Sequence, residues 1–100
     1  MEVLSDIYDV LKIDVSTRHD KVDIDELGFT YDGWKFIKTV VVLSSSIASA
    51  YLIFNEPSGA PIPVSVGDSF EDMKIERIYF TNTLTSAGGT VVLYLDGVKA

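Results

Sequence analysis

The residues TVVVLSSSIASAYLIFNEPSGAPIP, numbers 39–63, decide the fold class of this chain. Two short runs in this stretch, 39–43 and 51–54, carry apolar or β-branched side chains on both faces of an extended backbone. Runs of this length are typical of strands, and apolar residues on both faces are typical of strands that are covered on both sides. The stretch therefore predicts two central β-strands.

The second half of the same stretch indicates where the chain turns. Residues 56–61 combine prolines with a glycine, which is typical of a turn. Beyond them, apolar residues alternate over 62–66, with Pro63 between them. Because proline has no N–H to donate to a neighbouring strand, we predict that this segment is an edge strand. Gly67-Asp68 then predicts another turn.

The interval Thr39–Asn55 carries no charge, and its 17 residues reach the lower limit for a membrane-spanning helix. Serines at positions 44, 45, 46 and 49 interrupt it. Two buried strands with a serine-rich connection explain this pattern better than a transmembrane helix does, so we expect no membrane partner.

Alternation of apolar and polar residues predicts further strands. Residues 11–15 and 22–25 alternate in this way, which is typical of half-buried strands. Residues 75–80 and 91–95 are apolar on both faces, like the two central runs. Residues 2–11 suit either a short N-terminal helix or a strand.

Two hairpins are predicted from turn chemistry. Asp32 and Gly33 lie between aromatic residues, and both tolerate the positive φ that a two-residue hairpin turn requires. The polar loop 82–89 ends in glycines and joins the strands 75–80 and 91–95, which predicts a second hairpin.

These elements predict an all-β fold. About seven or eight short strands with regular turn signals are typical of a β-sandwich or a small barrel. We expect a single β-sandwich domain over residues 1–100, with either a jelly-roll or an immunoglobulin-like topology, and one short N-terminal helix if residues 2–11 take that form.

Composition and charge restrict the classes of molecule that this protein is expected to bind. The chain has 100 residues, which suits one domain, and a net charge of -7. Residues 1–32 hold nine acidic and three basic residues, a balance of -6. Because an acidic surface repels phosphate, we expect neither nucleic acid nor an anionic membrane as a partner. The start lacks the features of a secretory signal, so we expect a cytoplasmic protein unless it belongs to a virion.

The tetrapeptide Gly67-Asp68-Ser69-Phe70 is similar to the GDSL motif of a hydrolase family. A serine nucleophile needs a base that takes its proton and a third group that orients the base. In that family the histidine follows the serine late in the chain, whereas His19, the one histidine here, precedes Ser69. The chain also has no cysteine. We predict that no residue is catalytic and that the protein is not an enzyme.

Two groups of residues are candidates for metal ligands. His19 and Asp20 are neighbours in a polar loop, but zinc takes three or four converging ligands, so a solvated histidine is the preferred interpretation. Asp23, Asp25 and Glu26 would need carbonyl groups and waters to complete a calcium site. Their alternation with apolar residues indicates a solvent-exposed face, and we predict no metal or cofactor site.

Two further motifs have ordinary structural interpretations. Gly88-Gly89 precedes a strand rather than a helix, so it does not have the context of a phosphate-binding loop. Tyr31, Trp34 and Phe36 would offer a surface on which a sugar or another ligand stacks. Aromatic residues in a small domain more often cover its core, which is the interpretation we favour.

The C-terminal half resembles a known class of protein. Residues 67–70, KIERIYFTNT at 74–83 and TVVLYL at 90–95 are similar in pattern to the ends of small virion proteins of tailed phages. The likeness covers residues 38–97 and leaves 1–37 unmatched. It implies a β-sandwich that assembles on a capsid or a tail, as a decoration, minor capsid or tail protein, and it carries over no functional residue.

The expected function is therefore structural. We expect a virion component that contacts copies of itself and other virion proteins, with a carbohydrate- or ligand-binding module that uses the aromatic residues near Trp34 as the alternative. A two-sheet sandwich covers only one face of each sheet, yet four strands are apolar on both faces. We therefore predict a closed homo-oligomer, a dimer or a trimer.

Overall fold

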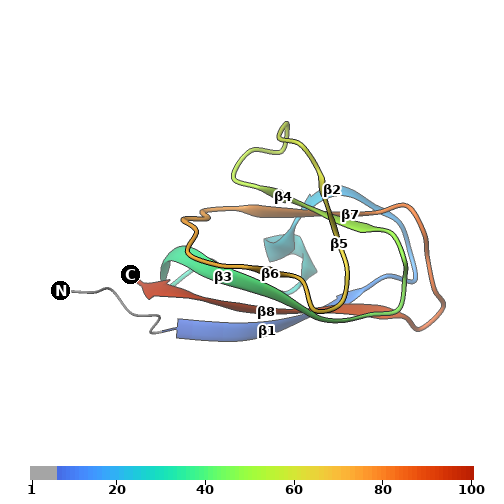
Figure 1. Cartoon of the computed structure of the whole chain (residues 1–100), viewed down its shortest axis with the longest axis horizontal. Helices are drawn as coiled ribbons and strands as arrows, with labels where there is room; N and C mark the ends of the chain where they lie inside the picture. Colours follow the sequence, from blue (N-terminus) through green and yellow to red (C-terminus); the bar gives the residue numbers. More distant parts are fainter. Residues whose placement is uncertain (1–6) are drawn as a thin grey trace.

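The computed structural model describes residues 7–100, which form two antiparallel β-sheets stacked face to face (Figure 1). No α-helix occurs within these residues. The elements, in chain order, are β1 (Ile7–Asp14), β2 (His19–Asp23), the 3-10 turn η1 (Ile24–Leu27), β3 (Trp34–Ser45), β4 (Ala50–Phe54), β5 (Ile62–Val64), β6 (Ser69–Phe70), β7 (Ile78–Asn82) and β8 (Thr90–Lys99). The predicted all-β sandwich is confirmed.

The strands pair like one long hairpin that has been rolled up. β4 pairs with β5, β3 with β6, β2 with β7 and β1 with β8, and every pair is antiparallel. Rolling places β1-β8-β3-β6 in one sheet and β2-β7-β4-β5 in the other. This nested pairing in two four-stranded sheets is the topology of a jelly roll, which selects it over the immunoglobulin-like arrangement.

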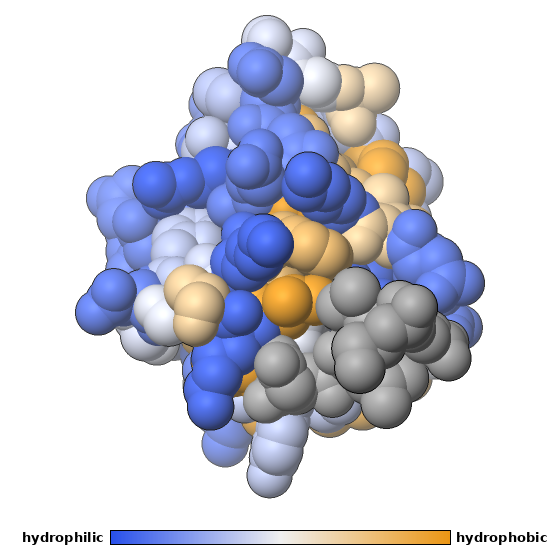
Figure 2. Space-filling view, turned by 90° about the vertical axis from the view of Figure 1, so that its left-hand side faces the viewer, coloured by the Kyte–Doolittle hydropathy of each residue, from blue (hydrophilic) through white to orange (hydrophobic). Residues whose placement is uncertain are grey.

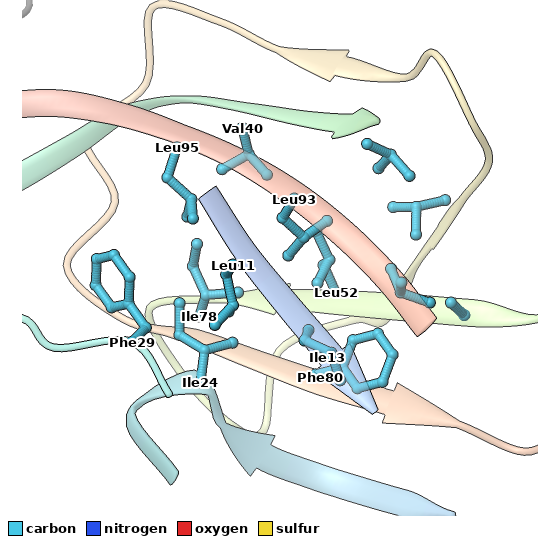
Figure 3. Close-up of a cluster of buried hydrophobic side chains, with 14 of the residues drawn as sticks. Leu11, Ile13, Ile24, Phe29, Val40, Leu52, Ile78, Phe80, Leu93 and Leu95 are labelled. Carbon is cyan, nitrogen blue, oxygen red and sulfur yellow. The ribbon is translucent and has the colours of Figure 1, made fainter. Parts of the chain in front are cut away.

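The hydrophobic core lies between the two sheets, where inward side chains of both layers meet (Figure 3). Along β8, every second residue from Val91 to Gly97 is buried, as the alternation of a strand requires. Phe80 is the largest of the fully buried side chains. Others that fill this space are Leu11, Ile13, Ile24, Val40, Leu52, Ile78, Leu93 and Leu95.

Several predicted strands are confirmed. Leu11, Ile13 and Val15 are buried, whereas the residues between them are exposed. β5 contains Pro63 and lies at the edge of its sheet, as a missing N–H requires. The predicted strand 75–80 begins later than expected, because β7 starts at Ile78.

The uncharged interval 39–55 belongs to strands in two different sheets. Its first part lies in β3 and its second part in β4, and a short serine-rich connection joins them. In the described part of the chain, no helix is long and apolar enough to cross a membrane.

Both predicted hairpins are wrong, although both turns exist. At Asp32-Gly33 the N–H of Trp34 donates to the carbonyl of Tyr31 at 3.0 Å, but the strand that follows pairs with β8 and β6. The loop 82–89 leads from β7 in one sheet to β8 in the other. Turn residues indicate where a chain reverses, but they do not determine which sheet the next strand joins.

The second predicted strand ends early. β2 stops at Asp23, and Ile24–Leu27 forms a 3-10 turn. The Asp23 carboxylate accepts the N–H of Asp25, which starts this turn in the manner of a helix cap. Ile24 is still buried, as the alternation predicts.

The N-terminal segment 2–11, for which the sequence suits either a helix or a strand, is only partly described. Of residues 2–11, those from Ile7 onward belong to β1. Residues 1–6 lie outside the described part of the chain, so the short helix stays a prediction there.

Candidate functional site

Of the three acidic residues Asp23, Asp25 and Glu26, the two aspartates lie beside Arg77. Its Nη1 is 3.1 Å from Asp23 Oδ2 and 3.4 Å from Asp25 Oδ2, while Glu26 is exposed in η1. The side chain of Asp23 is only 15% exposed, so the solvent-exposed face predicted for it is wrong. Arg77 already compensates the two carboxylates. Within residues 7–100, no three acidic or histidine side chains lie close enough together to hold a metal ion.

Tyr31 ties this ion-pair group to β7. Its hydroxyl donates to Asp23 Oδ1 at 2.7 Å and accepts the N–H of Ile78 at 3.0 Å. The guanidinium of Arg77 lies over its ring, 4.4 Å from the centroid. Burial, and then the hydrogen bond to Asp23, raise the pKa of the Tyr31 phenol well above its usual range. The aspartates and Tyr31 therefore act as a structural clamp between η1 and β7.

Replacing Tyr31 with phenylalanine should cost about 1–3 kcal/mol at neutral pH, because the Ile78 N–H and Asp23 lose a buried partner. The substitution should also make the free energy of unfolding fall less steeply as the pH rises above about 10. The pKa of Tyr31 is higher in the folded than in the unfolded chain. Its contribution is therefore complete below the ordinary tyrosine pKa of about 10 and is lost as pH rises above that value.

Urea unfolding at a series of pH values from neutral to strongly alkaline measures this contribution. The free energy of unfolding should fall more steeply for the wild type than for Tyr31→Phe once the pH exceeds about 10. If the free energy of unfolding fell equally steeply with pH in both proteins, the raised pKa assigned to Tyr31 would be contradicted.

Ser69 and His19 are not brought together. Ser69 is exposed at the start of β6, and its Oγ donates to Glu71 Oε2 at 3.0 Å. His19 begins β2, in the other sheet. Gly88, with a φ of 69°, and Gly89 shape the loop that precedes β8. The structure therefore does not bring His19 to Ser69 as a triad like that of the hydrolase family would require.

The aromatic residues near the Asp32-Gly33 turn cover one end of the core. The ring of Phe29 contacts those of Tyr31 and Trp34, each at a centroid distance of 5.1 Å. Tyr31 and Trp34 both pack against the core, which confirms the favoured interpretation for them. Phe36 is half-buried, with the ammonium of Lys74 at 5.8 Å from its ring.

A pocket of about 310 Å³ opens where β2 lies beside β7. Asn82, which is 1% exposed, is the one buried polar side chain among the described residues, and it lies at this pocket. The pocket is lined by Arg18, His19, Asp20, Thr81, Asn82 and Thr83. Of these residues, the sequence marks only His19 and Asp20 as site candidates, because the phage-like pattern over 74–83 carries over no functional residue.

Hydrogen bonds to the backbone set the orientation of the Asn82 amide. Its Nδ2 donates to the carbonyls of Thr17 at 3.0 Å and Leu84 at 2.7 Å. Its Oδ1 accepts the N–H of His19 at 3.0 Å and lies 2.6 Å from Nδ1 of the same residue. Because an amide oxygen can only accept, this network assigns the proton to Nδ1 and leaves Nε2 of the neutral ring as an acceptor.

His19 is therefore not the solvated loop residue that the sequence suggested. It is half-buried, and its ring lies edge-on to Phe80 at a centroid distance of 5.7 Å. Next to it β2 bulges, because the register shifts between His19 and Val22. Lys21 in this bulge has a φ of 51°, which residues other than glycine rarely adopt. Bulges and strained backbone of this kind occur preferentially beside functional sites.

A second feature lies on the outer face of the sheet that contains β1, β8 and β3. Val10 lies opposite Tyr94, which lies opposite Val41, and the rings of Tyr8 and Tyr94 stack at a centroid distance of 6.2 Å. We call these residues and their apolar neighbours the outer strip: Tyr8, Val10, Val41, Leu43, Val92 and Tyr94. Viewed from the end where β1 begins, the molecule is mostly hydrophilic around a limited apolar region (Figure 2).

Comparison of the chain with protein-family models, with curated proteins and with solved structures finds no match. The outer strip and the pocket beside His19 are therefore the features from which a function can be argued.

Proposed function

We propose that this protein is a non-enzymatic assembly protein of a viral particle, and that the outer strip binds a second copy of the same chain. The exposure of this strip carries the proposal. Tyr8 is 71% exposed, Val10 50% and Leu43 48%. A contiguous apolar surface of this kind usually marks a site of association.

The strip has the layout of an interface. Its centre is the row formed by Val10, Tyr94 and Val41. Towards one end Tyr8 lies opposite Asp96, and towards the other Val92 lies opposite Lys12. An apolar centre with charged residues at the rim is typical of protein–protein interfaces.

The two rim charges favour a second copy as the partner. Asp96 and Lys12 lie at opposite ends of the strip. When two such faces stack with their strands antiparallel, Lys12 of each copy lies over the end of the strip where Tyr8 and Asp96 of the other copy lie. A surface that complements itself in this way suits a closed two-fold dimer.

The free edge of β1 is a less suitable contact than the face. The N–H of Val10 donates to Oδ1 of Asp9 at 2.8 Å, so this donor is satisfied within its own strand. Charged residues on an edge strand, here Asp9, Lys12 and Asp14, are a common protection against edge-to-edge pairing. We therefore infer face-to-face association.

The fold and the resemblance support the viral part of the proposal. Jelly rolls occur in viral capsid and lectin domains, although a fold alone does not assign a function. The likeness of residues 38–97 to virion proteins of tailed phages favours a decoration, minor capsid or tail protein. A lectin would be expected to offer Tyr31 or Trp34 to a sugar, and both pack against the core.

Light scattering coupled to size exclusion tests the association. We expect the mass of a dimer of the 11.0 kDa chain. Leu43→Lys should shift the protein to the monomer, because it places a charge in the strip. Leu84→Lys is the matched control, since Leu84 is 49% exposed and lies in the loop before β8, outside the strip.

A wild-type monomer at high concentration, or equal dissociation by both variants, would refute the proposed interface. The viral assignment is tested separately by the gene neighbourhood. We expect genes for terminase, portal or tail proteins beside this one, and a neighbourhood of metabolic genes would contradict the assignment.

A further inference from the structure

We infer that the pocket between β2 and β7 binds a small anion that also carries hydroxyl groups, with its carboxylate or phosphate group held by Arg18 and one of its hydroxyl groups donating to Nε2 of His19. The pocket belongs to the sheet opposite the outer strip. This inference is therefore independent of the proposed assembly role, and either can fail without the other.

The first argument is that the ring of His19 is already held in one orientation and one tautomer. Asn82 holds Nδ1 at 2.6 Å, and Asn82 is itself held by the carbonyls of Thr17 and Leu84. The hydrogen bond to this fixed amide sets the orientation of the ring, and its second nitrogen, Nε2, is the acceptor left for a ligand. A histidine that only packed against Phe80 would not need its tautomer to be set in this way. Orientation of an imidazole by a buried polar partner is common in binding and metal sites.

The second argument is local charge. Residues 18–21 contain two cations, Arg18 and Lys21, and one carboxylate, whereas the first third of the chain is strongly acidic. Arg18 is exposed, and no ion pair in residues 7–100 involves it. A guanidinium at a concave surface is well suited to an oxyanion, because its parallel N–H groups bind carboxylate or phosphate in a bidentate manner.

The third argument concerns the rest of the ligand. Thr81 Oγ1 accepts the N–H of Lys21 at 3.0 Å, so its own proton is available to donate into the pocket. Asp20, which also lines the pocket, would repel a ligand that was only an anion. It would accept a hydrogen bond from a hydroxyl of the same ligand. An acidic sugar or a sugar phosphate has both kinds of group, and a pocket of about 310 Å³ is at the lower end of the usual range for small-molecule sites.

The backbone supports this interpretation. The neighbouring residues His19 and Asp20 both line the pocket, at the bulge in β2 and beside the left-handed Lys21. Regular alternation would instead place residues 19 and 21 on one face and 20 on the other. The unfavourable φ of 51° at Lys21 is therefore part of the backbone geometry that forms the pocket.

The test is titration of the full-length, isotope-labelled protein with glucuronate, glucose 6-phosphate and glucose, followed by backbone amide NMR shifts. We expect saturable shifts in residues 18–22 and 81–83 with at least one of the two anions at millimolar concentrations. The two anions distinguish a carboxylate from a phosphate ligand. Glucose, which lacks the charge, should bind at least about tenfold more weakly.

Variants assign the contacts. Arg18→Gln removes an exposed cation and should weaken binding about tenfold without loss of fold. Lys35→Gln is the matched control, because Lys35 is an exposed cation on β3, away from the pocket. His19→Phe keeps a ring beside Phe80 but removes Nε2, and the folded variant should lose binding.

Several outcomes would overturn the inference. These are no shifts at β2 and β7 with either anion, equal binding of glucose, an equal loss in Arg18→Gln and Lys35→Gln, or wild-type affinity in folded His19→Phe.

Discussion

Alanine at position 97 is expected to destabilise this protein by more than about 3 kcal/mol, enough to unfold much of a small domain. Gly97 lies inward on β8, where β3 passes closest to it. A Cβ at this position would overlap the carbonyl oxygen of Phe36 and lie 2.9 Å from the Cα of Ile37. Both atoms belong to the backbone, so no side-chain rotation relieves the contact, and the longest strand pair of the molecule would have to separate.

Gly33→Ala is the matched control for this substitution. Gly33 has a φ of 90° with nothing within 4 Å of an added Cβ, so alanine there meets conformational strain alone. It should cost about 1–2 kcal/mol. Urea unfolding measures both values, and a wild-type midpoint for Gly97→Ala would show that β3 and β8 do not approach as closely as described.

Asn82→Ala is expected to have the second large effect, a loss of about 3 kcal/mol or more. The side chain makes four contacts of hydrogen-bond length, to the carbonyls of Thr17 and Leu84 and to the main chain and ring of His19. These contacts hold the loops at both ends of the pocket to β7. Because each buried group left without a partner costs about 1–3 kcal/mol, the losses accumulate.

Thr83→Ala is the control for Asn82→Ala, since Thr83 is the exposed neighbour that also lines the pocket. It should change the free energy of unfolding by less than about 0.5 kcal/mol. Both values come from urea or thermal unfolding. Equal stability of the two variants would mean that the Asn82 network does not hold these loops.

Local features of the sequence were sufficient to predict the strands and several of their environments. The alternation over residues 11–15 correctly indicated which side chains of β1 are buried. The absent N–H of Pro63 correctly placed β5 at an edge. Residue type and spacing decide such features directly, because the two faces of a strand alternate and proline has no hydrogen to donate.

The candidate site depends on contacts that spacing cannot indicate. His19 and Asn82 are 63 residues apart, and the partners Asp23 and Arg77 are 54 apart. From the sequence, His19 was interpreted as solvated and the aspartates as an exposed face. Each polar group acquires its partner only when β2 is laid beside β7, which gives the histidine an oriented amide and the aspartates a cation.

The sequence by itself determined that this chain is an all-β sandwich with an edge at Pro63 and turns near Asp32-Gly33 and 82–89. The tertiary structure alone decided that these turns cross between sheets and that the topology is a jelly roll. The physical reason is that hydrophobic periodicity specifies which face of a strand is buried but not its neighbour. Neighbours are chosen when both sheets close over one core, where β1 meets β8 at the other end of the chain.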